Sequence, residues 1–97
     1  MITYIEALVI AQHYVGAFNP QIMGATPVIL ESETIEFSLG WVFVYTSKEF
    51  LKTGDYSYML AGNAPIIIDK RNGKLTETGT VYSIEYYIKE YERTQSE

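Results

Sequence analysis

The stretch Leu39-Gly-Trp-Val-Phe-Val-Tyr45 is the longest apolar run of the chain, and it decides the fold. Odd and even positions of residues 41–45 are equally apolar, so both faces of a strand there are hydrophobic. This is typical of a central strand that is covered on both sides. Gly40 permits a tight turn at the start of this strand. We therefore expect an antiparallel pair with the segment before it, across residues 38–40.

The segment that precedes this strand, from Val28 onward, is strand-like, but its alternation breaks in the middle. Val28 and Leu30 share one parity, whereas Ile35 and Phe37 fall on the other. Because a strand keeps every second side chain on one face, a change of parity needs an extra residue or an interruption. Two alternatives follow: one strand with a bulge near residues 32–33, or two short strands joined there.

A second hairpin is predicted further along the chain. Ile66-Ile67-Ile68 has the composition of a buried strand, and Asn72-Gly73 separates it from a second arm that ends at Gly79. Asn and Gly both tolerate positive φ, so this dipeptide is the strongest hairpin signal in the sequence. We expect a two-residue turn there.

Helices are predicted at both ends of the chain. Thr3 and Glu6 have the spacing of a capping box, so a helix begins at Tyr4, and Gly16 is suited to its end. Its expected buried stripe consists of Ile5, Leu8, Val9 and Gln12, and the apolar face is widened by Tyr4, Ala7, Ala11, Tyr14 and Val15. Ser83 caps the last helix. The buried stripe of that helix has the same spacing and consists of Ile84, Tyr87, Ile88 and Tyr91.

A short helical insert lies between the hairpins: Ser47 caps a helix that stops at Gly54, and a further turn starts at Asp55 or Ser57. The elements together predict an α+β fold. We expect a small antiparallel sheet of about four strands, with the N-terminal and C-terminal helices packed on one face. A length of 97 residues fits one domain over residues 1–97, with residues 94–97 frayed.

Several classes of function are excluded by composition. The chain has no cysteine, which excludes disulfides and thiolate chemistry, and its one histidine is His13. A hydrolase needs a nucleophile, a base and an orienting group, which a lone mid-helix histidine does not supply. Glu31 and Glu33 share one face of the expected strand, where a solvated or partner-facing edge is favoured over a catalytic pair. We expect no enzyme activity, no cofactor and no metal.

The net charge of −5 is unevenly spread. Residues 1–47 contain no lysine or arginine and four glutamates, which are Glu6, Glu31, Glu33 and Glu36. Such a surface repels nucleic acid and attracts a basic protein. The apolar run is far shorter than the roughly 20 residues of a membrane span, and the first residues lack the basic region of a signal peptide. We expect a cytoplasmic protein that binds neither nucleic acid nor membranes.

Tyrosine is the unusual residue of this composition, with nine copies. Its apolar ring and polar tip suit half-buried positions and protein interfaces. Most of the nine are expected in the core. Tyr86 lies off the apolar stripe of the last helix, and folding alone does not explain it.

From Gly40 onward, the order of motifs resembles a known family. The motifs are Gly40-Trp-Val-Phe-Val-Tyr45, Ser47-Lys-Glu-Phe-Leu51, Thr53-Gly-Asp55, Leu60-Ala-Gly-Asn-Ala-Pro-Ile66, Asp69-Lys70, Asn72-Gly73 and Ile84-Glu-Tyr-Tyr-Ile88. Over residues 40–92 this order resembles the immunity protein 35 family, also called the YrhB-like domain, and residues 1–39 match in layout alone. The resemblance implies a cytoplasmic antidote that is encoded beside a toxin of a bacterial polymorphic toxin system and binds that toxin. The family has no catalytic motif to transfer.

A second interpretation is a small heat-stable chaperone-like protein that binds unfolded chains, because one member of the family is described in this way. Both interpretations describe a binding protein, and the chemistry of the residues favours a binding protein over an enzyme. The genes beside this one distinguish the two, because a large secreted toxin encoded directly upstream supports immunity.

The candidate partner surface combines the acidic segment 31–36, whose glutamates precede every positive charge in the chain, with Tyr45 and the end of the insert. Its candidate contacts are Glu31, Glu33, Glu36, Tyr45, Asp55, Tyr56 and Asn63. The expected partner is the cognate toxin domain. An unpaired strand edge also permits a homodimer.

Overall fold

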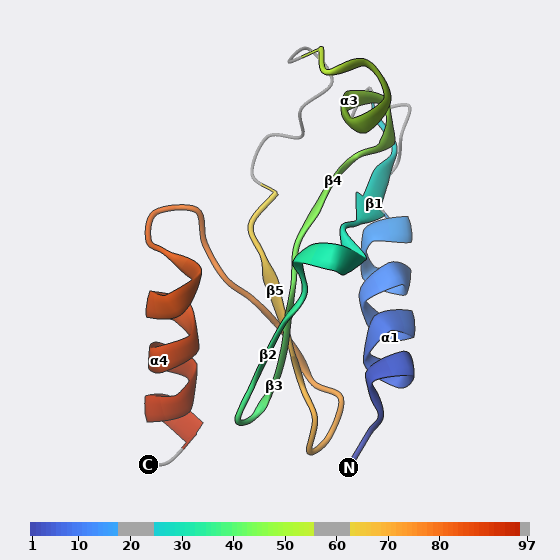
Figure 1. The fold of residues 1–97 in the computed structure, drawn as a ribbon. Coiled ribbons are helices and arrows are strands. Elements are labelled where there is room, and N and C mark those ends of the chain that lie inside the picture. Colours follow the sequence, from blue (N-terminus) through green and yellow to red (C-terminus); the bar gives the residue numbers. More distant parts are fainter. Residues whose placement is uncertain (18–24, 56–62, 96–97) are drawn as a thin grey trace.

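The computed structural model describes residues 1–17, 25–55 and 63–95 (Figure 1). Its helices are α1 (Tyr4–Gly16), α3 (Lys48–Thr53) and α4 (Ile84–Gln95), and η1 (Glu31–Glu33) is a short 3-10 helix. Its strands are β1 (Pro27–Ile29), β2 (Ile35–Phe37), β3 (Gly40–Phe43), β4 (Tyr45–Ser47), β5 (Ile66–Asp69) and β6 (Leu75–Glu77). Because the strands are antiparallel and helices occur at both ends, the predicted α+β class is confirmed.

The larger sheet has four strands in the order β2-β3-β5-β6, and the smaller sheet pairs β1 with β4. β3, which the apolar run forms, lies between β2 and β5, so its predicted central position is confirmed. β4 continues the same run of chain into the smaller sheet, with Val44 between the two strands. Residues 40–43 thus belong to the larger sheet and residues 45–47 to the smaller sheet. The molecule is elongated, with extents of 42, 27 and 23 Å.

The break in alternation after Val28 marks the crossing of the chain from one sheet to the other. β1 pairs with β4, η1 follows, and β2 then pairs with β3. The Leu30 amide donates to the Val44 carbonyl at 2.9 Å, which anchors the crossing where β3 passes into β4. The alternative of two short strands is confirmed. Glu31 and Glu33 lie on a 3-10 helix, so the predicted strand position of these two residues is wrong.

The first hairpin has the predicted tight turn, since Phe37 pairs with Gly40 across two residues. The second hairpin has a longer loop than predicted. The Gly73 amide donates to the Asp69 carbonyl at 2.8 Å, and the Asp69 amide donates to the Lys74 carbonyl at 2.9 Å. Residues 70–73 therefore form the loop, and the prediction of a two-residue turn is wrong.

Side-chain hydrogen bonds explain the longer loop. Asp69 Oδ1 accepts the Arg71 amide at 2.8 Å, and Asn72 Oδ1 accepts the Lys74 amide at 2.9 Å. These bonds stabilise a helix-like turn that needs positive φ at Gly73, where φ is +75°. A two-residue turn would need positive φ at Asn72 as well, and among the described residues only glycines have it.

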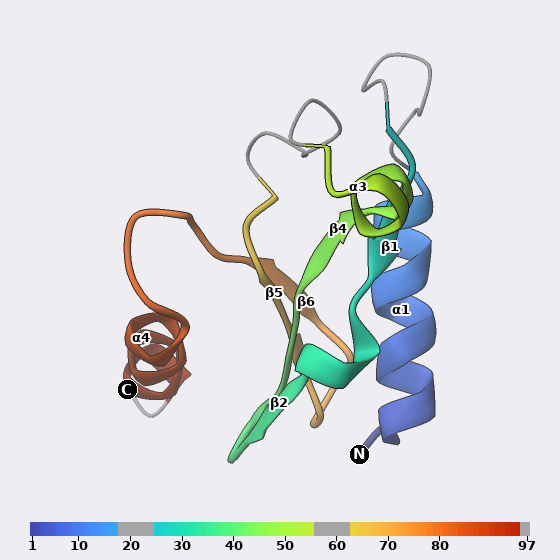
Figure 2. The ribbon, with the colours of Figure 1, turned by 45° about the horizontal axis from the view of Figure 1, so that its top comes forward.

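The two terminal helices cover opposite faces of the larger sheet, which corrects the expectation that both pack on one face. α1 packs against Trp41, Phe43, Ile66 and Ile68, whereas α4 packs against the residues between them, Val42 and Ile67. Figure 2 shows the sheet between α4 on the left and α1 on the right. Because β3 and β5 are apolar at successive positions, both faces of the sheet are hydrophobic. If both helices packed on one face, the apolar side chains of the other face would be exposed to water.

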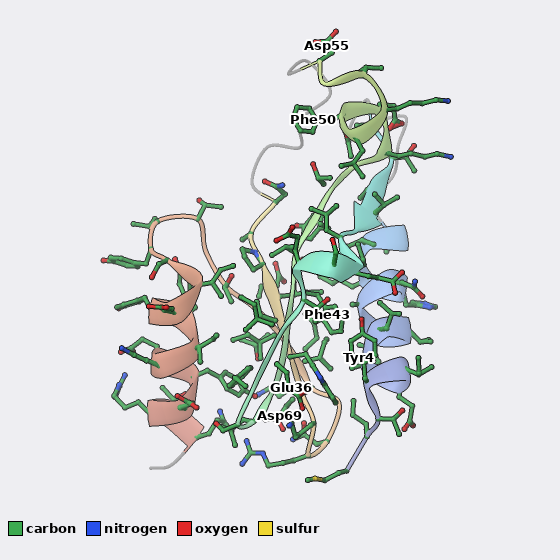
Figure 3. The ribbon with its side chains drawn as sticks, viewed as in Figure 1. Tyr4, Glu36, Phe43, Phe50, Asp55 and Asp69 are labelled. Carbon is green, nitrogen blue, oxygen red and sulfur yellow. The ribbon has the colours of Figure 1, made fainter. Side chains whose placement is uncertain are left out.

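The buried face of α1 lies mainly on the flanking part of the predicted apolar face and not on its central stripe. Ala7, Leu8, Ala11 and Val15 are buried, while two stripe members, Ile5 and Val9, are 64% and 56% exposed. The reason is the small size of alanine, which lets the helix approach the aromatic side chains of β3. Tyr4 completes this contact, with its ring 6.1 Å from that of Trp41 and 6.0 Å from that of Phe43 (Figure 3).

The predicted helix ends are confirmed. Thr3 and Glu6 form the capping box of α1, and Ser47 Oγ accepts the Phe50 amide at 2.8 Å at the start of α3. Gly54 ends α3 with φ +70°. Ser83 Oγ accepts the Tyr86 amide at 3.2 Å at the start of α4. The further turn predicted after Gly54 falls largely outside the described residues, and α4 continues through residues 94 and 95.

The α4 stripe packs on the sheet as predicted, through Ile84, Ile88 and Tyr91. Tyr87 is half-buried and contributes its ring to contacts with neighbouring tyrosines. Of the helices that the structure describes, none has the length and apolar character that crossing a membrane requires.

We predict that Gly40→Ala lowers the free energy of unfolding by about 2 kcal/mol or more, because an added Cβ would overlap the backbone carbonyl oxygen of Ile68 in the neighbouring strand. Gly16→Ala is the matched control, since nothing lies within 4 Å of a Cβ there. Urea unfolding followed by circular dichroism measures both. Equal midpoints for the two variants would show that the close approach of β3 and β5 at Gly40 is not needed.

Candidate protein-binding surface

Glu31 and Glu33 are exposed on η1, at the crossing between the two sheets. Neither carboxylate forms an ion pair with another residue that the structure describes. The 3-10 helix holds both residues on a short, hydrogen-bonded turn, because the Glu33 amide donates to the Leu30 carbonyl and the Thr34 amide to the Glu31 carbonyl. The two negative charges therefore have fixed backbone positions and uncompensated side chains.

Glu36 lies in a different electrostatic environment. It is on the edge strand β2, and its Oε2 forms an ion pair with Lys70 Nζ at 3.2 Å. The same ammonium group lies 5.3 Å from the centre of the Trp41 ring, so it contacts both an anion and an aromatic face. The charge of Glu36 is locally compensated, unlike that of Glu31 and Glu33.

Tyr45 does not lie on the surface, so its predicted place in the partner surface is wrong. It is 5% exposed and packs with Val15 and Ala25, and burial raises the pKa of its hydroxyl. Asn63 is half-buried and donates its amide Nδ2 to the Tyr45 carbonyl at 3.0 Å. This bond gives Asn63 a structural role in holding the chain that leads into β5.

The remaining candidates do not lie beside Glu31 and Glu33 on η1, which we call the acidic turn. Asp55 is exposed just after α3 at one end of the molecule, whereas Glu36 lies toward the other end (Figure 3). Tyr56 lies outside the described residues. Among the described members of the predicted set, the structure brings Glu31 together with Glu33 and Asn63 together with Tyr45.

Sequence reasoning missed a buried polar network centred on Asp69. This residue is 1% exposed, and its carboxylate accepts hydrogen bonds from Arg71 Nη2 and Tyr91 Oη, each at 2.7 Å. Arg71 also donates Nε to Asp69 Oδ1 at 3.0 Å and Nη2 to Gln95 Oε1 at 2.9 Å. The hydrogen bonds from Arg71, and then that from Tyr91, hold the pKa of Asp69 well below its usual range.

The network ties the β5–β6 hairpin to α4. A sequence signal for it exists: an aspartate ends a run of three isoleucines, two residues before an arginine. Elsewhere in the described residues, no group of three or more histidine, aspartate or glutamate side chains is placed to hold a metal ion. His13 lines an open hollow on α1 with Val9, Gln12, Gly16 and Ala17, where no acidic residue of the described chain joins it.

A cluster of tyrosines is exposed where the chain enters α4. Tyr82 and Tyr86 are 58% and 42% exposed, and their ring centres are 4.2 Å apart. Tyr87 packs edge-on against Tyr86 with ring centres 5.5 Å apart, and Val81 beside them is 79% exposed. This contact explains Tyr86, which the helix stripe left unexplained, and exposed tyrosines are typical of protein interfaces.

Comparisons with known proteins give a consistent result. The family model described as immunity protein 35 matches residues 6–92. A relative from Escherichia coli strain K12, described as the uncharacterized protein YrhB, is 41% identical over 92 residues, which cover 95% of this chain and 90% of the relative. No solved structure matches the chain significantly.

We predict that Asp69→Asn lowers the free energy of unfolding at neutral pH by about 2 kcal/mol, because it removes the buried carboxylate that accepts hydrogen bonds from Arg71 and Tyr91. Glu90→Gln is the matched control. It removes one partner of the exposed Glu90–Arg93 pair, whose N–O distance is 2.8 Å, and should cost less than about 1 kcal/mol. Urea unfolding measures both, and equal costs would show that the buried network does not stabilise the fold.

The contribution of Asp69 should also depend on pH in a defined direction. Its pKa is lower in the folded chain than the ordinary value of about 4 in the unfolded chain, so the stabilisation is complete above that value. It is lost as the pH falls further, because the unfolded chain takes up the proton more readily. The difference in unfolding free energy between wild type and Asp69→Asn should therefore shrink between about pH 5 and pH 2. A difference that stays constant would exclude the ionised carboxylate as its source.

Proposed function

Since the chain belongs to the immunity protein 35 family, we propose that it is an immunity protein, which neutralises a bacterial toxin by binding the toxin domain directly. The family match carries this proposal, because it extends from the first turn of α1 into α4 and thus includes nearly the whole fold. We further propose that it acts in the cytoplasm, against a toxin encoded beside it in a polymorphic toxin system.

Neutralisation by binding needs a stable scaffold and an exposed surface, and needs no reactive group in the antidote. Two helices hold the sheet from opposite faces, and the Asp69 network fixes the second helix. The scaffold can therefore present charged and aromatic side chains with little loss of entropy on binding. We propose accordingly that the protein is not an enzyme and that it inhibits by occupying a surface that the toxin needs.

The acidic turn is the part of the predicted surface that we retain for toxin recognition. Glu31 and Glu33 are exposed, close in sequence and unpaired with described residues, and the half of the chain around them carries no basic residue. Charges in such a position accelerate the approach of an oppositely charged partner more than they strengthen the final complex. We propose that they face a basic region of the toxin during association.

A second candidate function is the binding of unfolded chains, as a small chaperone-like protein does. It is favoured by large apolar side chains that are exposed on separate elements, such as Leu51 at 56% on α3 and Val81 at 79% before α4. Scattered apolar contacts suit many unfolded clients, whereas a toxin needs one defined surface. Suppression of the aggregation of several unrelated unfolded proteins, without a stable complex with the neighbouring toxin, would favour this candidate.

We predict that Glu31→Lys with Glu33→Lys lowers the association rate constant with the toxin domain encoded beside this gene by about tenfold at low salt. The effect should shrink at high salt, because screening weakens the interaction between exposed charges. Stopped-flow binding at two salt concentrations measures it, and survival of cells that express the toxin measures the consequence.

The control for this experiment is charge reversal elsewhere. Glu33→Lys and Glu85→Lys change the net charge equally, but Glu85 lies on α4. We expect Glu33→Lys to slow association and Glu85→Lys to slow it much less. If both variants have the same effect, the net charge and not the acidic turn guides association. If the wild-type protein forms no complex with the toxin, the proposed function is wrong.

A further inference from the structure

The strand β6 ends the larger sheet, and one side of its backbone is open. The Asp69 amide donates to the Lys74 carbonyl at 2.9 Å, and the Thr78 amide donates to the Pro65 carbonyl at 3.1 Å. Because antiparallel ladders alternate, residues 74, 76 and 78 direct their amides and carbonyls toward β5. Leu75 and Glu77 direct theirs away from it, and no strand of the described chain pairs with that side.

An apolar hollow adjoins this edge on the α1 side. Its volume is about 500 Å³, and it is lined by Val9, Ile10, His13, Tyr14 and Leu75. Four of these five residues are aliphatic or aromatic. Glu77 lies on the same face, but Tyr14 holds its carboxylate by a hydrogen bond. Burial first, and then this carboxylate, raise the pKa of Tyr14 to about 12, which keeps the phenol protonated as a donor.

A second hollow adjoins the same edge on the α4 side and has a different chemistry. Its volume is about 190 Å³, and hydroxyl groups of Thr76, Thr78 and Thr94 are among the groups on its lining residues. Glu90 also lines it, whereas the side chain of Glu77, which borders it, lies on the α1 face, and no lysine or arginine is among its described lining residues. Glu90 is ion-paired with Arg93, so this hollow has no uncompensated acidic side chain among its described lining residues.

The geometry points to strand addition: we propose that an extended segment of the toxin domain pairs with β6 and becomes the fifth strand of the sheet. Successive side chains of a strand point to opposite faces, so alternate residues of the segment enter the two hollows. The α1-side hollow suits aliphatic side chains, and the smaller α4-side hollow suits short side chains that contact its threonines. The segment therefore has aliphatic residues at alternate positions, and it belongs to a basic toxin domain, which the net charge of −5 attracts. This inference rests on the proposed function.

A second copy of this chain fits the edge less well. Symmetric antiparallel pairing about Thr76 satisfies the backbone, but it places Glu77 of each copy opposite Leu75 of the other, where the hollow is apolar. Pairing about Glu77 opposes two carboxylates, and pairing about Leu75 opposes Glu77 to the loop residue Gly73. Burying the charged Glu77 carboxylate against an apolar side chain, or opposing two such carboxylates, is costly even with the hydrogen bond from Tyr14, so each register is penalised or short.

The opposite edge of the sheet is also less suited. In β2, the residues at positions 35 and 37 direct their backbone groups toward β3, so within that strand Glu36 alone presents them outward. The side chain of Glu36 is ion-paired with Lys70 and 66% exposed, and charges on an edge strand discourage pairing. β6 offers two outward residues and a hollow on each face.

Amide hydrogen exchange of the complex tests the proposal directly. In the free protein, the Leu75 and Glu77 amides should exchange rapidly, whereas the Thr76 and Thr78 amides should be protected. In the complex with the toxin domain encoded beside this gene, protection of Leu75 and Glu77 should rise by about a hundredfold or more, as in a paired strand. A complex that forms without this protection overturns the inference and leaves the proposed function intact.

A matched pair of variants tests the apolar hollow. Val9 lines it, whereas Ile5 lies one turn earlier on the same helix, is similarly exposed and lines neither hollow. Val9→Lys should raise the dissociation rate constant by about tenfold, and Ile5→Lys should leave it within about twofold. Both change the net charge equally, so a difference between them cannot come from long-range attraction.

The remaining outcomes are also decisive. Equal dissociation rates for Val9→Lys and Ile5→Lys overturn the inference. Protection of Leu75 and Glu77 that appears in the free protein and grows with its concentration assigns the edge to a homodimer, and this too overturns it. If the wild-type protein forms no complex with the toxin domain, the proposed function fails, and the inference fails with it.

Discussion

The arrangement of this molecule depends on two neighbouring strands that are apolar at successive positions. Phe43, Ile66, Ile67 and Ile68 are each 0% exposed, and they point alternately to the two faces of the sheet. Full burial of one such side chain contributes about 1.5–3 kcal/mol, so neither face can be left in water. The chain meets this constraint with one helix on each face. Every other element either frames this central pair or extends from it.

Local signals in the sequence were sufficient for the ends of elements and for the central strand. The capping pair Thr3 and Glu6, the cap at Ser47 and the stop at Gly54 act through their own backbone neighbours, and the structure has all of them. The loop at residues 70–73 was mispredicted because the buried carboxylate of Asp69 overrides the preference of Asn72-Gly73. A pattern of local propensities does not contain that tertiary contact.

The errors on the candidate surface have a similar origin. Tyr45 was predicted on the surface because the apolar ring and polar tip of tyrosine suit an interface, but the smaller sheet and α1 enclose it. In the sequence, Ile5 and Val9 fit the apolar face of α1 as well as Ala7 and Ala11 do. The structure buries the alanine side, because α1 packs closely against the aromatic side chains of β3. Glu31 and Glu33 kept their exposure although their local structure was mispredicted.

The two proposals for binding separate the formation of a complex from its persistence. Exposed charge on η1 acts over a distance and is screened by salt, whereas the edge of β6 acts only at contact, through backbone groups with fixed directions. An antidote benefits from both properties, because it must reach the toxin before the toxin reaches its target and must then remain bound. The exposed tyrosines beside α4 lie close along the chain to this edge and have the composition of an interface.

The Asp69 network also has a consequence for the order in which the chain folds. The contacts between Asp69 and Arg71 span two residues, so they form as soon as the hairpin closes, whereas the contact with Tyr91 spans 22 residues. α4 therefore docks onto a hairpin whose charged pair is already in place. During synthesis on the ribosome this helix emerges after the sheet. Until it does, Val42 and Ile67 on the uncovered face of the sheet remain open to contact with other nascent chains.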